Sequence, residues 1–306
     1  MKIGRVLLKT LMPLAALSAC AAETGATEPA SSGTSPAAVD ADPALWVVKD
    51  ADTTVYLFGT VHVLKPGLSW FDEAVREAFD ASDTVVLEMV EPDQATMVGL
   101  ITKLGVATDG KTLRDRMSAD ARARYEAAMT ATGLKPAMFD RFEPWMAAVN
   151  LTVISVMAAG YDPASGAEKG LGGAASSGGK TVIGLETPEQ QLGYFDTIPM
   201  QSQLAFLDAT VTQVGEVKEG MERMVGAWAR ADTEELGQIM QEGLDDPIVH
   251  KALIRDRNAR WADWIEERMK QPGTVFVAVG AGHLAGKDSV QGDLEKAGLT
   301  ATRVRY

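Results

Sequence analysis

Two of the three histidines in this chain of 306 residues end the same four-residue pattern. The first copy is Gly59-Thr60-Val61-His62, which follows an apolar run near the start of the folded region. The second is Gly280-Ala281-Gly282-His283, which follows another apolar run near the end. Catalytic and metal-binding side chains often lie at the carboxyl ends of strands in α/β sheets. The third histidine, His250, lies in a polar helical stretch, so we expect chemistry at His62 and His283.

Two glutamates join these histidines, because two further predicted strands end in a carboxylate. Glu88 follows the apolar run Val85-Val86-Leu87, where an unpaired carboxylate is costly. Glu186 follows the strand predicted over 181–185. Two imidazoles and two carboxylates suit a divalent metal, with Mn²⁺ or Co²⁺ favoured over Zn²⁺, which would activate water or polarise a carbonyl. Alternatively, a carboxylate acts as general base without a metal.

Each of these residues also has a purely structural interpretation. Either histidine could be packed and bonded to the backbone, and Glu88 could belong to a structural ion pair. Glu186 directly precedes a predicted helix, whose dipole stabilises a carboxylate whatever its function. Arg257 and Asn258 lie in a charged helical stretch, and this pattern indicates a solvated face, with Trp261 on the buried side.

Short apolar runs bounded by turn residues predict the strands that must position these side chains. The runs at 45–48 and 55–58, separated by Asp50-Ala51-Asp52, are typical of a β-hairpin. Further strands are predicted at 84–87, 181–185, 274–279 and 300–304.

Helical spacing of apolar residues and capping residues predict the helices. They are expected at 72–81, over most of 199–270 and at 288–297. Ser118 is the predicted N-cap of a helix that runs to about 132. Another helix is predicted to begin after Thr187, with Thr187 as N-cap, Pro188 as the first helical residue and Gln190 as the third. The apolar segment 142–159 is short for a membrane span and contains polar residues, so it is predicted as a core helix. The glycine-rich segment 160–179 is predicted as a flexible loop that could act as a lid.

The first nineteen residues are typical of a lipoprotein signal peptide. Lys2, Arg5 and Lys9 give a basic start, 7–17 is mostly apolar, and Leu17-Ser18-Ala19-Cys20 resembles a lipobox. Cys20 is the only cysteine, so no intramolecular disulfide can form. Lipidation of Cys20 would hold the protein on a membrane facing the periplasm, and the alanines that follow favour the outer membrane. An ordinary secretory signal with an incidental cysteine is the alternative.

Composition separates a tether from a folded region. Residues 20–43 are rich in small and polar residues and predict a disordered tether, while 44–306 is long enough for one large α/β domain or two small ones. The formal net charge of −13 becomes 26 − 42 = −16 without the three basic residues of 1–19. Such an acidic chain is a poor candidate for binding nucleic acid or anionic lipid.

Taken in order, these segments resemble the TraB/GumN family over about residues 44–306. The resemblance is carried by 45–46, 56–62, 85–88, 184–187, 190–191, 257–258, Trp261, Ile265 and 277–286. This family is similar to the animal Tiki proteins, which are metal-dependent proteases with paired GxxH motifs and a glutamate. Its wider superfamily resembles erythromycin esterases and an iron-regulated, haem-binding lipoprotein. The implied fold is a mixed central β-sheet wrapped by helices, with a largely helical insertion at about 92–180.

By this resemblance His62, Glu88 and His283 match the family's site residues. Glu186, Arg257 and Asn258 match recurrent polar positions. The chain departs from the family after Tyr161, where relatives often show an acidic residue followed by an aromatic-rich helix start, but this chain continues into glycines.

The expected function is therefore a periplasm-facing lipoprotein that hydrolyses peptide bonds with a metal. His62 and His283 would be ligands, Glu88 a ligand or the general base, and Glu186 a supporting carboxylate. Arg257, with Asn258 beside it, would pair with a site carboxylate or hold the substrate carbonyl oxygen. Two alternatives remain: a haem- or iron-binding lipoprotein without catalysis, and a scaffold for envelope or polysaccharide assembly.

Overall fold

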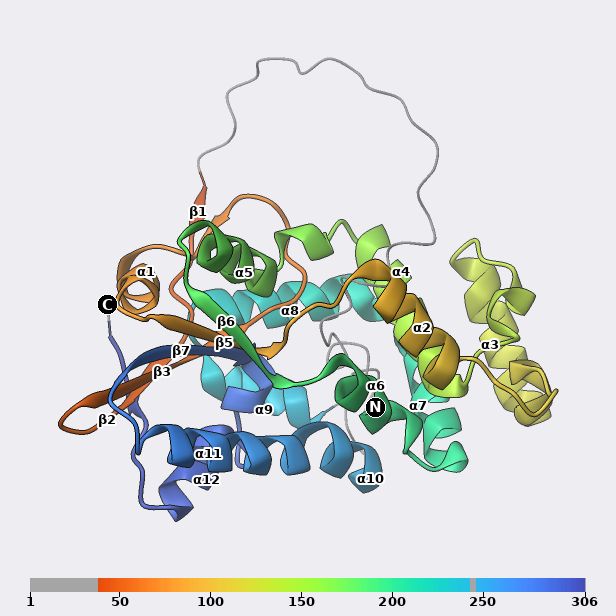
Figure 1. Cartoon of the computed structure of the whole chain (residues 1–306). Helices are drawn as coiled ribbons and strands as arrows, with labels where there is room; N and C mark the ends of the chain where they lie inside the picture. Colours follow the sequence, from red (N-terminus) through yellow and green to blue (C-terminus); the bar gives the residue numbers. More distant parts are fainter. Residues whose placement is uncertain (1–37, 243–245, 306) are drawn as a thin grey trace.

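The computed structural model describes residues 38–242 and 246–305 (Figure 1). The predicted signal peptide, Cys20 and most of the predicted tether lie outside these residues. The short strand β1 (Val39–Asp40) pairs in parallel with β4 (Leu68–Ser69), and Ala41 is buried. The last residues of the predicted tether therefore lie against the folded domain.

A six-stranded mixed sheet forms the centre of the molecule, with strand order β6-β5-β7-β3-β2-β8. The strands are β2 (Leu45–Lys49), β3 (Thr53–Thr60), β5 (Thr84–Met89), β6 (Thr181–Glu186), β7 (Gly273–Gly280) and β8 (Thr302–Arg303). Four neighbouring strands, β6, β5, β7 and β3, run parallel, while β2 is antiparallel to both β3 and β8. The predicted hairpin and the predicted mixed α/β fold are confirmed.

The register of the parallel strands brings their carboxyl ends to one edge of the sheet. Thr60 is level with Gly280, Leu87 with Ala278, and Met89 with Glu186. The residues that follow these strands therefore meet in space although they are far apart in the sequence. This is the edge of an α/β sheet at which ligands commonly bind.

Helices wrap the sheet (Figure 1). They are α1 (Glu73–Asp80), α2 (Gln94–Gly105), α3 (Ala119–Ala131), α4 (Pro144–Ala158), α5 (Ala167–Ser177), α6 (Pro188–Asp196), α7 (Met200–Gln213), α8 (Val217–Ala229), α9 (Thr233–Gln241), α10 (Pro247–His250), α11 (Asp256–Arg268) and α12 (Val290–Lys296). Short 3-10 turns occur at Leu113–Arg116, Pro136–Phe139, Pro163–Ser165, Val214–Glu216 and Ala281–Leu284, and a π-helical turn spans Lys251–Arg255.

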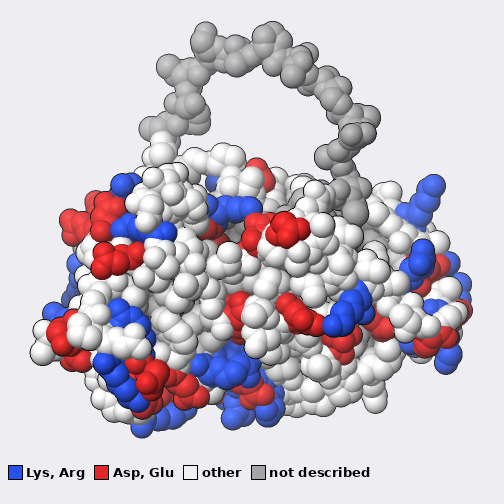
Figure 2. Space-filling view, in the orientation of Figure 1, with Lys and Arg blue, Asp and Glu red and all other residues white. Residues whose placement is uncertain are grey.

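The alternation of side chains along the strands separates the two faces of the sheet. Phe58 and Leu87 pack on the face covered by α1, α5 and α8, as Figure 1 shows above the sheet. Leu57 and Val86 pack on the opposite face, against α11 and α12. A third apolar cluster lies among α3, α4 and α7. Acidic and basic side chains are interspersed over the molecular face seen in Figure 2.

Two predicted helix starts are confirmed by hydrogen bonds of their capping residues. Ser118 caps α3 by accepting from the backbone N–H of Ala121. Thr187 and Gln190 form a reciprocal capping box at the start of α6. The apolar segment 142–159 contains α4, most of which is buried as predicted for a core helix. Within the described residues, no helix is long and apolar enough to cross a membrane.

The prediction of a flexible loop over 160–179 is wrong, because α5 occupies most of that segment. Its glycines allow close packing that outweighs their poor helix propensity. A Cβ on Gly166 would lie 2.1 Å from the backbone oxygen of His62, and one on Gly170 would lie 3.2 Å from the Trp70 ring. The N–H of Ala167 also donates to the carbonyl of Val61 at 2.9 Å. Close contacts with residues 61–70, rather than local preference, make this segment helical.

Candidate active site

His62 lies just beyond β3 and is paired with a carboxylate from α5. Its Nδ1 lies 2.7 Å from Oε1 of Glu168, and the Thr60 hydroxyl donates to the same oxygen. Burial by itself lowers the pKa of His62, but the adjacent Glu168 carboxylate, with a smaller contribution from Glu88, raises that pKa above its ordinary value. Glu168 was missed as a site residue because α5 was not predicted. The only signal for it was an Ala-Glu-Lys run of helix formers after Gly166.

Glu88 lies in β5 and points to the same face of the sheet as Val86, toward α11. Its side chain is 2% exposed, and both of its oxygens accept hydrogen bonds. Oε1 accepts from the N–H of Gly280 at 2.7 Å, while Oε2 accepts from Arg257 at 2.7 Å and from Gln191 at 3.1 Å. Burial by itself raises the pKa of Glu88, but Arg257, the two histidines and the Gly280 N–H outweigh it and hold the pKa at about 2. Glu88 is therefore an anion throughout the physiological range.

Arg257 is the buried cation that holds Glu88 and Glu186 together. Its Nε donates to Oε1 of Glu186 at 2.8 Å, and its Nη2 donates to Oε2 at 2.8 Å. This two-pronged pairing is the strong arginine–carboxylate geometry. Its guanidinium carbon also lies 4.5 Å from the Trp261 ring centroid. Gln191, at the second turn of α6, donates to Glu186 at 3.3 Å as well as to Glu88.

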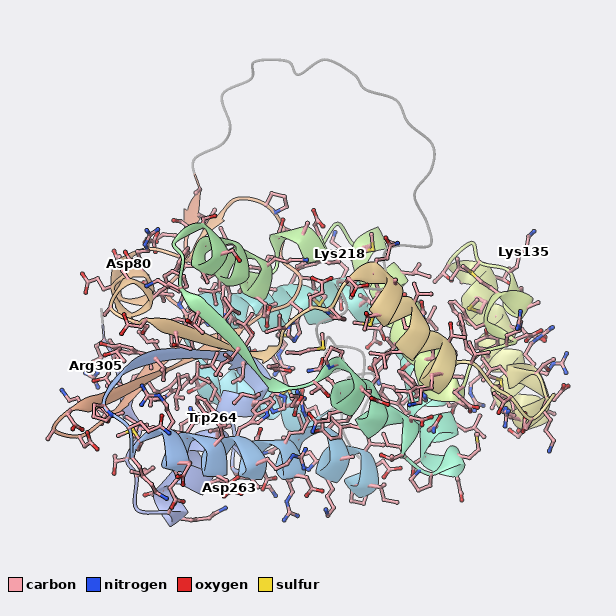
Figure 3. The ribbon with its side chains drawn as sticks, viewed as in Figure 1. Asp80, Lys135, Lys218, Asp263, Trp264 and Arg305 are labelled. Carbon is pink, nitrogen blue, oxygen red and sulfur yellow. The ribbon has the colours of Figure 1, made fainter. Side chains whose placement is uncertain are left out.

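The prediction that Arg257 and Asn258 lie on a solvated face is wrong. Arg257 is 1% exposed and Asn258 is fully buried. Charge normally marks the solvent side of a helix, but here the carboxylates of two strands compensate a buried guanidinium. Within α11, Arg257 and Asn258 lie one turn before the buried Trp261 and Ala262, so the regular helical period places them on the buried face. Asp263, labelled on α11 in Figure 3, is on the exposed face of that helix.

His283 is held in one tautomer by Asn258. Nδ1 of the ring lies 2.6 Å from Oδ1 of Asn258, whose Nδ2 donates to the carbonyl of Asp288 at 2.6 Å. Because the side-chain nitrogen of Asn258 is engaged with Asp288, its oxygen Oδ1 faces the His283 ring. Nδ1 of His283 therefore carries the proton and donates to this oxygen. The Nε2 lone pair then accepts from Nη1 of Arg257 at 3.1 Å. Burial, reinforced by the positive charge of Arg257, lowers the pKa of His283 to about 3, so this imidazole is neutral.

Gly280 is the point at which the two histidines and Glu88 meet. A Cβ at this position would lie 3.1 Å from Oε1 of Glu88, 3.6 Å from Nε2 of His62 and 3.6 Å from Cδ2 of His283. The missing side chain leaves part of an inner cavity of about 60 Å³, which these three residues line. This volume is enough for a few water molecules. The structure therefore brings His62, Glu88 and His283 together, with Glu186, Arg257 and Asn258 directly behind them.

The donor types and charges at this site suit a divalent cation. Both imidazoles have their Nδ1 beside an acceptor, the arrangement that commonly orients histidine ligands of metals. The site brings together three carboxylates, those of Glu88, Glu168 and Glu186, and one guanidinium, that of Arg257. In the described residues, no group of three or more His, Cys, Asp or Glu side chains is already arranged around one point as a metal site.

The fold and this cluster define a mixed α/β protein with a buried His/Glu/Arg site at the carboxyl ends of its parallel strands. The model of the TraB/PrgY/gumN family matches residues 44–303, and the chain belongs to this family, as the sequence motifs predicted. An uncharacterized protein of Treponema pallidum (strain Nichols) is 23% identical over 262 residues, which cover 80% of this chain and 78% of that relative. No solved structure matches the chain.

Proposed function

We propose that this protein is a metal-dependent hydrolase that cleaves amide bonds of peptides. The observation that carries the proposal is the meeting of His62, Glu88 and His283 around Gly280 in an inner cavity. Buried, unusually ionised groups that line a cavity are typical of catalytic sites. The resemblance to Tiki-like proteases, carried by the paired GxxH motifs, supports peptides as the substrate class.

Nε2 of His62, Nε2 of His283 and Glu88 would hold the cation, of which Mn²⁺ or Co²⁺ is favoured and Zn²⁺ is the next candidate. Because Nη1 of Arg257 lies 3.1 Å from Nε2 of His283 in this structure, the guanidinium would have to release that nitrogen when the cation binds. The cation would supply an activated water and polarise the substrate carbonyl. Glu88, kept anionic by its surroundings, serves as ligand or as the base that accepts a proton from the attacking water.

The residues behind this group act by positioning it. Arg257 engages both oxygens of Glu186 and one of Glu88, which supports pairing with site carboxylates over contact with the substrate. Asn258 keeps Nδ1 of His283 protonated, so Nε2, which accepts from Arg257 in this structure, is the nitrogen that would bind the cation. Oε1 of Glu168 lies 2.7 Å from Nδ1 of His62 and places a carboxylate beside that ring. Glu88, Glu186, Arg257 and His283 are buried, and removal from water strengthens the electrostatic interactions among them.

The sharpest test is Glu88→Gln, which keeps the shape of the side chain and removes its charge. If Glu88 is the base, metal content stays and peptide turnover falls by about 100-fold or more; if it is a ligand, metal content falls as well. The exposed Glu189→Gln, which loses only a surface pair with Lys103, is the matched control. Metal analysis, thermal melting and hydrolysis of a peptide library with Mn²⁺, Co²⁺ or Zn²⁺ are measured on each protein.

Two further variants and the wild type separate the alternative functions. His62→Ala and His283→Ala are expected to remain folded and to lose turnover. A wild-type protein that cleaves no peptide with any of the three metals would contradict the proposal. Haem absorbance in the purified protein would then favour the binding protein, and a protein with neither metal nor haem would favour the scaffold.

We also propose that Cys20 carries a lipid that anchors this domain to a membrane facing the periplasm. The basic start, the short apolar run and the single cysteine support this location.

A further inference from the structure

A second, larger cavity of about 420 Å³ opens beside His62, between α5 and strands β5 and β6. Its volume is within the range of about 300–1,000 Å³ that is usual for small-molecule sites. Its lining is mostly apolar: Leu87, Met89, Val90, Val182, Gly172 and Gly173. His62 lines both this cavity and the inner cavity, so both cavities adjoin the proposed metal ligand.

Glycines on α5 leave this space open. A Cβ on Gly173 would meet nothing within 4 Å, and one on Gly172 would meet only the Leu87 side chain, at 3.9 Å. Gly166 and Gly170 are required because a side chain there would meet His62 or Trp70, but no such contact requires glycine at 172 or 173. Each costs the helix about 1 kcal/mol relative to alanine. What the two glycines provide is room above Leu87 and Met89.

The inner end of this cavity is polar, and its rim is charged. Glu168 lines the cavity next to His62, and its Oε2 is buried without a hydrogen-bond partner among the described residues. A buried carboxylate oxygen without a donor is costly, so a ligand N–H there would be favourable. At the rim, Lys169 pairs with Glu91 at 2.5 Å, and both side chains are well exposed. Exposed pairs of this kind are weak and open readily.

We propose that this cavity, lined by α5, β5 and β6, is the specificity pocket of the site and takes a large apolar side chain of a peptide. The peptide N–H next to that side chain would donate to Glu168, which directs the adjoining amide bond toward His62. The apolar walls supply the binding energy and the single polar end supplies the orientation, as is usual for such pockets. This inference rests on the proposed hydrolysis of peptides and names the kind of residue recognised.

The test compares two neighbouring serines on α5 that receive the same substitution. Ser176 and Ser177 are both exposed on α5, but Ser176 lines the pocket and Ser177 does not. The probes are N-acetyl-tryptophanamide and N-acetylglycinamide, with binding measured by calorimetry on the full chain. We expect the wild type to bind the tryptophan amide at least about tenfold more tightly, because burying its ring removes a large apolar area from water.

Ser176→Leu and Gly173→Leu should each remove most of that preference, and Ser177→Leu should keep it. Thermal melting checks that each variant is folded, and Ser176→Leu provides the answer if Gly173→Leu does not fold. Equal affinity of the wild type for both amides would contradict the proposed specificity pocket. A Ser176→Leu protein that keeps the preference for the tryptophan amide would contradict it as well. Binding is measured without turnover, so the two proposals can fail separately. A protein that binds the tryptophan amide but cleaves no peptide would support the specificity pocket and contradict the proposed hydrolase activity.

Discussion

One arginine determines the charge state of the whole site. Among the described residues, Arg257 carries the only positive charge that pairs with Glu88 and Glu186, and its Nη1 donates to Nε2 of His283. Breaking such a buried pair by removing one partner typically costs about 3–5 kcal/mol, because the other charge is left uncompensated. At the scale of residues, Arg257 therefore organises the neutral imidazole of His283 and the carboxylates of Glu88 and Glu186. The second imidazole, that of His62, lies beside Glu168.

Neutral His283 should make the protein acid-labile in a defined pH window. Its pKa of about 3 in the folded protein lies below the ordinary value of 6.5, so the unfolded chain binds a proton first as the pH falls. Stability present above pH 6.5 is therefore lost toward pH 3, at up to about 1.4 kcal/mol per pH unit. His283→Gln should show a flatter dependence of the free energy of unfolding between pH 7 and 5, measured by urea denaturation. An unchanged slope would contradict the neutral assignment.

The Glu168 carboxylate should be what raises the pKa of His62. Glu168→Gln removes the charge and keeps the shape, and burial should then lower the pKa of the His62 ring relative to the wild type. Titration of the ring by nuclear magnetic resonance measures this directly. Glu91→Gln, at the rim of the neighbouring cavity, is the control that should leave His62 unchanged. Equal His62 titration in Glu168→Gln and wild type would show that the pairing is absent in solution.

At the scale of elements, α6 delivers Gln191 to the two carboxylates, and its start depends on Thr187. Thr187→Ala removes half of a capping box and should lower the free energy of unfolding by about 1 kcal/mol. Ser118→Ala removes a similar cap from α3, away from the site, and should cost a similar amount. Only Thr187→Ala should also weaken turnover or metal retention. Urea denaturation and metal analysis of both variants decide whether α6 positions the site or only stabilises the fold.

At the scale of the whole molecule, the predicted lipid on Cys20 determines where the domain is held. Cys20→Ser should abolish fatty-acid labelling and leave the protein in the soluble extracytoplasmic fraction, because no other cysteine can take the thioether-linked lipid. Metabolic labelling and fractionation measure this, and the domain itself should melt at the same temperature as the unlipidated wild type. Wild-type protein without labelled fatty acid would refute the anchor.

The sequence by itself determined the features that depend on neighbours within a few residues. The hairpin at 45–58, the cap at Thr187 and the strands that end near His62, Glu88, Glu186 and His283 follow from apolar alternation and local hydrogen bonds. Because parallel strands align their ends, a common site was predictable from these four residues alone.

Only the tertiary structure decided how Arg257 is buried against the strand carboxylates and that Glu168 joins the site. Arg257 pairs with Glu88 across 169 positions of sequence, and Glu168 reaches Thr60 across 108. No local sequence pattern predicts such pairs. Without knowledge of the tertiary partners, a charged helix is predicted to be solvated and a glycine-rich segment is predicted to be a loop. Burial reverses both interpretations, because a guanidinium that two strand carboxylates compensate can be buried, and glycines that fit closely against a sheet can be helical.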